Sequence, residues 1–423
     1  MPDASMAAPV TVGAPADPLD VALRIARSLA PVDNVLEAVR GDSLLSERWH
    51  DHGTASGFAG LALLFGCFDQ CREDEGWDRS AHEHLSVAVE AAQRVPYLPP
   101  GLSSGMAGLG FVALSLAGKN KRYGSGRRYG RLRGTIDGRL AEYVAAWIDR
   151  PEAGGDSRRS LDVITGVAGI SAYLVCRPEA DALASLRGPL LTRLAAHLNE
   201  GHLPLRPRSD ATDCGLAHGL PGLVSALALA RLRGIAVANS GAALRTGTAW
   251  LLDRQVTDRW GANWPMDDSA PQAAGSAPPT HAAWCYGAPG VTRSLLLAGR
   301  ALADPAMVHT ALNAIEAIRR RPDRQRRLVT PTFCHGEAGL AHLFHRTAVE
   351  TGIKVFAAEA RRLHQRLAGS FDPLARFGYR AVQARGALVD SPGLLDGAAG
   401  VAAVLLSAAV NDAPDWDRLF LVR

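Results

Sequence analysis

The sequence lacks the features that would place the protein across a membrane, outside the cell or on nucleic acid. No apolar run reaches the roughly 18 residues that a membrane-spanning helix needs. The first 16 residues hold no basic segment followed by an apolar block, so we expect no signal peptide. The net charge of +4 is small for 423 residues and does not favour nucleic-acid binding.

Cysteine is scarce, and its use argues against a disulfide framework. A long chain without an export signal is expected to keep its thiols reduced, which indicates a cytoplasmic protein. Some thiols are then free to bind a metal, and the others are expected to be buried filler. The six cysteines are at positions 67, 71, 176, 214, 285 and 334.

Alternating β-branched residues are also scarce, so we expect no substantial sheet; what the chain has instead is a repeated glycine pattern. A Gly-x-x-Gly frame followed by an apolar run recurs at intervals of 48 to 68 residues. One such frame would mean nothing, but seven at this spacing indicate an internal repeat. The frames are Gly57/Gly60, Gly105/Gly108, Gly166/Gly169, Gly219/Gly222, Gly287/Gly290, Gly336/Gly339 and Gly397/Gly400.

Each frame follows an amphipathic helical segment and precedes a more uniformly apolar one. A helix that is apolar on all sides must be covered by others, so we predict an all-α fold, an α/α toroid of seven helix pairs. Residues 1–17 are expected to form a flexible tail and 18–423 a single domain. The predicted outer helices are 18–30, 82–94, 137–149, 187–199, 241–254, 305–320 and 353–367.

Two basic stretches and one long loop interrupt the pattern. Residues 119–133 and 319–327 are rich in arginine, and we interpret each as a solvated loop, with a docking surface for an acidic peptide as the alternative. The polar, proline-rich loop 256–279 is expected to line a functional opening.

The fifth and sixth frames carry a candidate metal site. Cys285 comes two residues before Gly287, and Cys334-His335 comes directly before Gly336. If the repeats are equivalent, these side chains meet at one end of the toroid, where two thiolates and an imidazole suit Zn²⁺ and leave a fourth position open. The alternative is that the cysteines are small buried filler and the histidine is an ordinary loop residue.

Four further residues lie near this candidate site in the repeat. His218 has the same place in its frame as His335 and is either a fourth ligand or a base beside the metal. Asp162, four residues before Gly166, is a helix cap or a catalytic partner. Tyr286 and His281 flank Cys285 and are placed to contact a substrate.

In order along the chain, Gly-Leu-Ala-His-Gly-x-Pro-Gly, Trp-Cys-Tyr-Gly-x-Pro-Gly and Cys-His-Gly resemble the motifs of the LanC-type lanthionine cyclases. The resemblance extends from about Pro18 to the last helix. It implies an α/α toroid with one zinc per chain, bound by Cys285, Cys334 and His335. It also implies that thioether rings form by addition of a peptide cysteine to dehydroalanine or dehydrobutyrine.

The same resemblance implies His218 as acid/base, assisted by Asp162, and a dehydrated precursor peptide as substrate. The family commonly has an arginine four residues before the first zinc cysteine, where this chain has His281. Only 17 residues precede the first predicted helix, so we expect a stand-alone cyclase served by a separate dehydratase. An exporter is a further candidate partner, and attachment at the membrane within a biosynthetic complex is the alternative to a free cytoplasmic protein.

Two other functions are compatible with these residues. One is addition of glutathione or another small thiol to dehydrated proteins, as in LanC-like relatives. The other is a non-catalytic toroid that binds a peptide. The complete candidate ligand set argues against the second.

Overall fold

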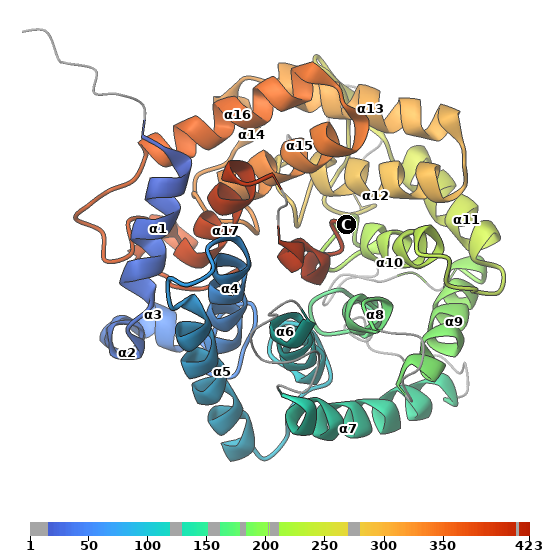
Figure 1. The fold of residues 1–423 in the computed structure, drawn as a ribbon. Helices are drawn as coiled ribbons and strands as arrows, with labels where there is room; N and C mark the ends of the chain where they lie inside the picture. Colours follow the sequence, from blue (N-terminus) through green and yellow to red (C-terminus); the bar gives the residue numbers. More distant parts are fainter. Residues whose placement is uncertain are drawn as a thin grey trace, which may run out of the picture.

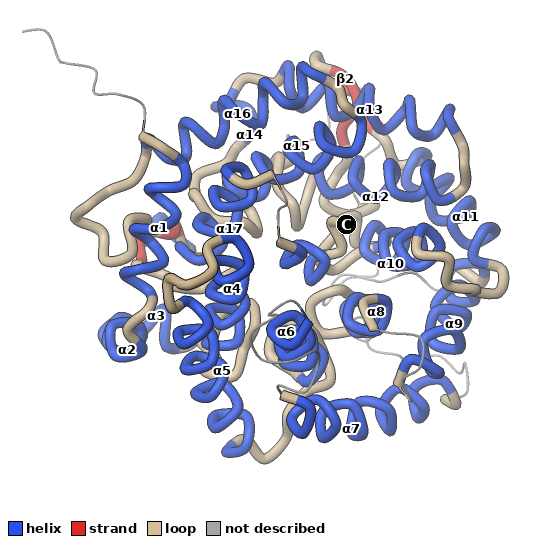
Figure 2. The backbone as a smooth tube through the Cα atoms, in the orientation of Figure 1, coloured by secondary structure: helices blue, strands red, loops and turns tan. Residues whose placement is uncertain are grey.

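The computed structural model describes residues 16–118, 129–150, 161–177, 183–201, 203, 211–269, 280–411 and 414–423. Within these residues, seven helices form an inner ring and seven an outer ring (Figures 1 and 2). The inner helices are α4 (Phe58–Cys71), α6 (Met106–Gly118), α8 (Val167–Val175), α10 (Leu220–Leu232), α12 (Ala288–Ala301), α15 (Glu337–Thr351) and α17 (Ala398–Ala409). The outer helices are α1 (Pro18–Leu29), α5 (Trp77–Arg94), α7 (Gly130–Ile148), α9 (Arg187–Asn199), α11 (Ser240–Asp253), α13 (Pro305–Arg320) and α16 (Lys354–Gly369).

The ring closes through the two ends of the chain. Six inner helices pack against the outer helix that follows them, whereas α17, the last, packs against α1, the first. Helix α17 also contacts α4, so the inner ring is continuous (Figure 1). The prediction of a closed α/α toroid of seven helix pairs is therefore confirmed.

The burial of the helices follows their composition. Residues 398–407 of α17 are all buried, as expected for a helix that is apolar on every side. Outer helix α16 buries one face, which includes Phe356, Leu363 and Leu367. Helix α1 begins as predicted, with Asp17 accepting a hydrogen bond from the backbone N–H of Leu19 at 3.2 Å.

The second glycine of every frame is required by a close backbone approach. A Cβ atom there would lie less than 3.0 Å from the carbonyl oxygen six residues earlier, which is closer than real Cβ atoms come. At Gly339, for example, the obstructing carbonyl belongs to Phe333. The seven glycines therefore fold each loop tightly against the first turn of its inner helix.

Backbone hydrogen bonds join the seven glycine loops into a closed circle. Each loop donates an N–H to a carbonyl of the next loop, and the seventh donates back to the first through Leu395 and Ala55 at 2.9 Å. The other links are Thr54 to Ser103, Ser103 to Ile164, Val163 to Ala217, Ala217 to Cys285, Cys285 to Cys334 and Cys334 to Leu395. Side chains carried by these loops are consequently held at one end of the toroid.

The C-terminal segment fills the middle of the ring, which the sequence did not predict (Figure 1). The 3-10 helix η4 (Asp415–Phe420) contacts α4, α6 and α8. The indole of Trp284 donates a hydrogen bond to the carbonyl of Phe420 at 3.2 Å, and the rings of Phe333 and Phe420 lie 4.9 Å apart. The C-terminal segment thus packs directly beneath the residues that precede Cys285 and Cys334.

Several short elements complete the described structure. In the described part of the chain the strands form two short hairpins, so the expected absence of a substantial sheet holds for those residues. The loop prediction for 256–279 was wrong at its start, because residues 256–263 form the first hairpin. Residues 270–279 of that loop lie outside the described residues. The short elements are α2 (Val32–Gly41), α3 (Ser43–Ser46), α14 (Asp323–Arg326), η2 (Ala184–Leu186), η3 (Ala384–Gly386), and the hairpins β1 (Val256–Asp258)/β2 (Gly261–Asn263) and β3 (Ala381–Val382)/β4 (Leu388–Val389).

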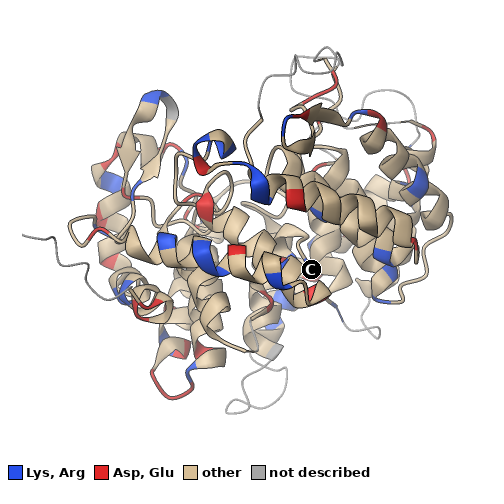
Figure 3. Ribbon diagram, turned by 90° about the horizontal axis from the view of Figure 1, so that it is seen from above, with Lys and Arg blue, Asp and Glu red and all other residues tan. Residues whose placement is uncertain are grey.

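The solvated-loop interpretation of the second basic stretch is wrong for two of its arginines, although Arg320, Arg324 and Arg327 are exposed. The side chains of Arg321 and Arg326 are 2% and 3% exposed, and they form ion pairs with Asp258 at 2.6 Å and with Glu359 at 2.7 Å. Buried charges of this kind require partners, so these arginines tie the outer layer together. Figure 3 shows the same intermixing of basic and acidic residues along the outer helices.

The first basic stretch lies mostly outside the described residues, which resume at Tyr129. Its last two arginines, Arg131 and Arg133, belong to the first turns of α7, which begins seven residues earlier than predicted. Residues 1–15 of the predicted tail also lie outside the described residues. Among the described helices, none has both the length and the apolar character needed to span a membrane.

Candidate metal centre

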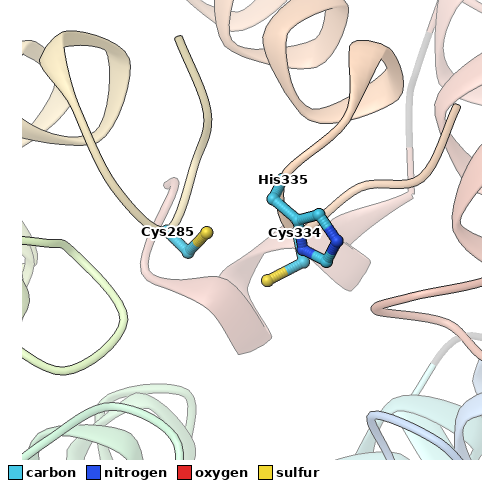
Figure 4. Close-up of side chains that lie close together, drawn as sticks. All are labelled: Cys285, Cys334 and His335. Atoms are coloured by element: carbon cyan, nitrogen blue, oxygen red, sulfur yellow. The ribbon is translucent and has the colours of Figure 1, made fainter. Parts of the chain in front are cut away.

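Cys285, Cys334 and His335 come together at the glycine-loop end of the toroid. Their ligand atoms all lie within 4.8 Å of one another. Two adjacent loops carry them, and the N–H of Cys285 donates to the carbonyl of Cys334 at 3.1 Å. In Figure 4 the two sulfur atoms and the imidazole face a common space.

The donor atoms fit a zinc ion. Zinc binds thiolate sulfur at about 2.3 Å and imidazole nitrogen at about 2.0 Å with tetrahedral geometry, so its ligands stand somewhat under 4 Å apart. A small closing movement of the three side chains would meet that requirement. The hydrogen bond from the Cys334 thiol, together with the nearby His335, lowers the pKa of Cys285 to about 6 despite burial. Conversely, the proximity of the Cys285 thiolate raises the pKa of Cys334. Of the two thiols, that of Cys285 is therefore the more readily deprotonated.

A buried carboxylate holds His218 in the neighbouring loop. The imidazole Nδ1 of His218 lies 2.7 Å from Oδ2 of Asp162, whose side chain is 2% exposed, whereas His218 is 44% exposed. The other carboxylate oxygen, Oδ1, accepts hydrogen bonds from the backbone N–H groups of Thr165 and Gly166 at 2.7 and 2.8 Å. Asp162 therefore closes the turn before α8 and orients His218, but the N-cap of that helix is Gly166, so the helix-cap interpretation is wrong.

The electrostatic surroundings of His218 favour its protonated form. Burial lowers the pKa of His218, but the hydrogen bond and charge of Asp162 outweigh this effect, with support from Asp213 and Cys285. The net result is a pKa above the ordinary histidine value of 6.5. The exposed side of the ring therefore holds a proton more readily than an ordinary histidine does.

A second carboxylate, which the sequence reasoning missed, supports Tyr286. The hydroxyl of Tyr286 donates to Oδ2 of Asp213 at 2.7 Å, and Oδ1 of Asp213 accepts from the N–H of Gly215, also at 2.7 Å. The Tyr286 and His218 rings are 6.5 Å apart. Asp213 is fully buried. Asp213 comes six residues before Gly219, whereas Asp162 comes four before Gly166, so alignment of the repeats would not have revealed it.

His281 is held by a backbone contact at the edge of this region. Its Nδ1 lies 2.8 Å from the carbonyl oxygen of Arg327, the C-cap residue that follows α14. The group of mutually close ligand atoms does not include His281. The contact described for its imidazole therefore anchors a loop and does not reach the cysteines.

Two more charged residues near the metal centre were also missed. Asp396 and His335 occupy the same frame position, directly before the first glycine, so alignment of the repeats would have revealed Asp396. The charge of Arg48 acts on both His335 and Asp396. Arg48 lies outside every frame, and only closure of the ring brings it here. The residues at this frame position are Ser56, Ser104, Thr165, His218, Tyr286, His335 and Asp396.

The fold and site define a class: a closed double ring of helices with a Cys-Cys-His group beside a carboxylate-supported histidine. Residues 48–421 match the family described as lanthionine synthetase C-like protein, and the chain belongs to this family. It is 24% identical over 312 residues to the nisin biosynthesis protein NisC of Lactococcus lactis subsp. lactis. The aligned region covers 68% of this chain and 72% of that protein. A solved structure of nisin cyclase superposes with a TM-score of 0.76 at 19% identity, over 95% of this chain and 98% of that one.

Proposed function

We propose that this protein is a zinc-dependent lanthionine cyclase that closes thioether rings in a dehydrated precursor peptide. The observation that carries the proposal is the meeting of Cys285, Cys334 and His335 next to His218. The loop of His218 touches the metal group directly, because the N–H of Ala217 bonds to the carbonyl of Cys285. Membership of the lanthionine synthetase C-like family and the likeness to nisin cyclase support it.

The three ligands would hold one zinc ion per chain and leave one coordination position open. When bound, zinc would lower the pKa of a substrate thiol in that position, which is about 8.5 for a free cysteine, and so supply a thiolate at neutral pH. Because two protein thiolates already balance the charge of the ion, a further thiolate would keep its nucleophilic character.

Ring closure then requires one proton from the protein. The cysteine sulfur forms a bond to Cβ of a dehydroalanine or dehydrobutyrine, and the double-bond electrons move toward Cα and the adjoining carbonyl. His218 delivers a proton to Cα, and its raised pKa keeps that proton available. Asp162 accepts the Nδ1–H of the imidazole, which leaves the exposed side of the ring for the substrate.

Tyr286 and His281 are assigned to substrate contact. The Tyr286 hydroxyl is fixed on Asp213 close to His218, where it can orient the residue that receives the proton. His281 stands near the loop end of the site and is proposed to meet the peptide at its rim. The expected partners are the dehydrated peptide, a separate dehydratase and an exporter, with the protein acting in the cytoplasm.

The first test is metal content. Purified protein should contain about one zinc per chain, the double variant Cys285→Ala/Cys334→Ala should contain almost none, and the control Cys67→Ala should keep it, because Cys67 is buried within α4. Near-stoichiometric zinc in the double variant would overturn the site.

The second test is the reaction with a dehydrated, cysteine-containing peptide. Cyclisation leaves the peptide mass unchanged and removes its alkylatable thiol, whereas transfer of glutathione adds mass. We expect His218→Asn to retain zinc and lose cyclisation by about 100-fold or more. A peptide that is bound but never cyclised by wild-type protein with zinc would favour the non-catalytic alternative.

A further inference from the structure

Asp396 lies beside the metal centre without a role in the proposed reaction. It stands directly before Gly397, the N-cap of α17, as His335 stands directly before Gly336, the N-cap of α15. The N–H of Cys334 donates to the carbonyl of Leu395 at 3.0 Å, and the N–H of Leu395 donates to Ala55 at 2.9 Å. The backbone circle therefore fixes Asp396 next to the Cys334-His335 pair.

The carboxylate of Asp396 faces two of the three proposed ligands. Its Oδ1 atom lies 3.5 Å from Nδ1 of His335, and its side chain is 27% exposed. It also stands close enough to the Cys334 thiol for hydrogen bonding. Within the described structure, Oδ1 is buried and its contact with His335 is longer than a normal hydrogen bond. A buried carboxylate oxygen of this kind is costly unless a charged or hydrogen-bonding group completes its surroundings.

We propose that Asp396 is the outer carboxylate of the metal centre, a positioning residue that holds the Cys334-His335 pair and strengthens metal binding. The inference rests on the zinc site proposed above. Groups that contact metal ligands from outside the coordination sphere commonly orient them, and loss of such a partner weakens metal affinity by about 10- to 100-fold. The negative charge of Asp396 also attracts the cation directly.

A direct ligand role fits the geometry less well. The set of ligand atoms that lie within 4.8 Å of one another contains Cys285, Cys334 and His335 but not Asp396. Asp396 contacts one side of that set, from the loop before α17, and faces the positive charge of Arg48. The carboxylate can therefore support the ligands while the fourth position remains open for substrate.

The experiment compares the metal affinity of Asp396→Asn with that of the wild-type protein, by competition with a zinc chelator. The control is Asp390→Asn, which removes a carboxylate of the same segment that serves the backbone N–H of Arg376. We expect the zinc affinity of Asp396→Asn to be about 10- to 100-fold lower than that of the wild type. The affinity of the control should stay within about twofold of wild type, and Asp396→Glu should recover part of the loss. Circular dichroism and thermal unfolding establish that each variant is folded.

Cobalt(II) substitution separates an outer carboxylate from a ligand. We expect Asp396→Asn to keep the intensity of the cobalt absorption bands of the wild type, because the number of ligands does not change. A clear change in band intensity would overturn the positioning role in favour of direct ligation. Zinc affinity within twofold of wild type in folded Asp396→Asn would also refute the proposal. Failure of the wild-type protein to bind zinc would instead refute the metal centre itself.

Discussion

Replacement of Asp162 by asparagine separates the two contacts that this carboxylate makes. The amide oxygen of asparagine can still accept the N–H groups of Thr165 and Gly166, so the turn before α8 should survive. Its NH₂ group, however, would take the place of Oδ2, which in the wild type lies 2.7 Å from Nδ1 of His218. An NH₂ group can only donate, so Nδ1 must become an acceptor and the imidazole must change tautomer.

The expected loss is catalytic and much larger than the effect on folding. A neutral imidazole in the reversed tautomer is a poor acid, and loss of general acid catalysis costs about 10²- to 10⁴-fold in rate. At about 1.36 kcal/mol per factor of ten, this raises the barrier by roughly 3 to 5 kcal/mol. The pKa of His218 should also fall, because burial lowers it and the carboxylate no longer opposes that effect.

The assay is single-turnover cyclisation of a dehydrated peptide across the pH range, with zinc content measured on the same samples. Because His218 must be protonated to act, the rate falls as pH rises through its pKa, and in Asp162→Asn this fall should occur at lower pH. Thr165→Val is the control, since it removes the 3.0 Å hydrogen bond from the threonine hydroxyl to Oδ1 and leaves the carboxylate itself in place. Folded, zinc-loaded Asp162→Asn with a rate within threefold of wild type would refute the assigned role of Asp162.

Three further predictions concern stability. Gly169→Ala forces a Cβ atom against the carbonyl of Val163 and should lower the free energy of unfolding by about 3 kcal/mol or more. In the control Gly138→Ala, in outer helix α7, the Cβ atom meets open space, and the free energy of unfolding should rise by up to about 1 kcal/mol. Equal urea midpoints for the two variants would contradict the close-approach argument. Burial lowers the pKa of His345 to about 4 and of His364 to about 3. Below about pH 6.5 the unfolded chain therefore binds more protons than the folded one. As the pH falls further, each histidine should lower the free energy of unfolding by up to about 1.4 kcal/mol per pH unit. An unfolding midpoint unchanged between pH 7 and 5 would rule this out. Phe420→Ala should cost about 3 to 5 kcal/mol and weaken zinc binding, because it opens a cavity under the metal loops; unaltered chelator competition would show that those loops need no such support.

Much of the fold was readable from the sequence because its determinants are local. The apolar run of α17 and the amphipathic pattern of α16 depend on residues within a few turns, and each glycine frame depends on a clash across six residues. The boundaries were less certain. Helix α7 begins at Gly130 instead of 137, because a glycine- and arginine-rich start has no apolar periodicity to mark it.

The candidate site was readable only in part. Cys285 and Cys334 have equivalent places in successive repeats and His335 is adjacent to Cys334, so repetition alone brought the three together. The buried ion pairs of Arg321 and Arg326 were misread as a solvated loop, because composition does not reveal that Asp258 and Glu359 lie opposite them.

The sequence by itself determined the repeat, the two layers of helices and the three candidate ligands, since periodicity and glycine sterics act over short stretches of chain. Tertiary structure decided what surrounds those ligands. Closure of the ring through α1 and α17 brings Arg48 to His335 and Asp396, although Arg48 and Asp396 are 348 positions apart in the chain (396 − 48). The C-terminal segment enters the centre for the same reason: packing selects partners by shape and burial, and these depend on the assembled ring.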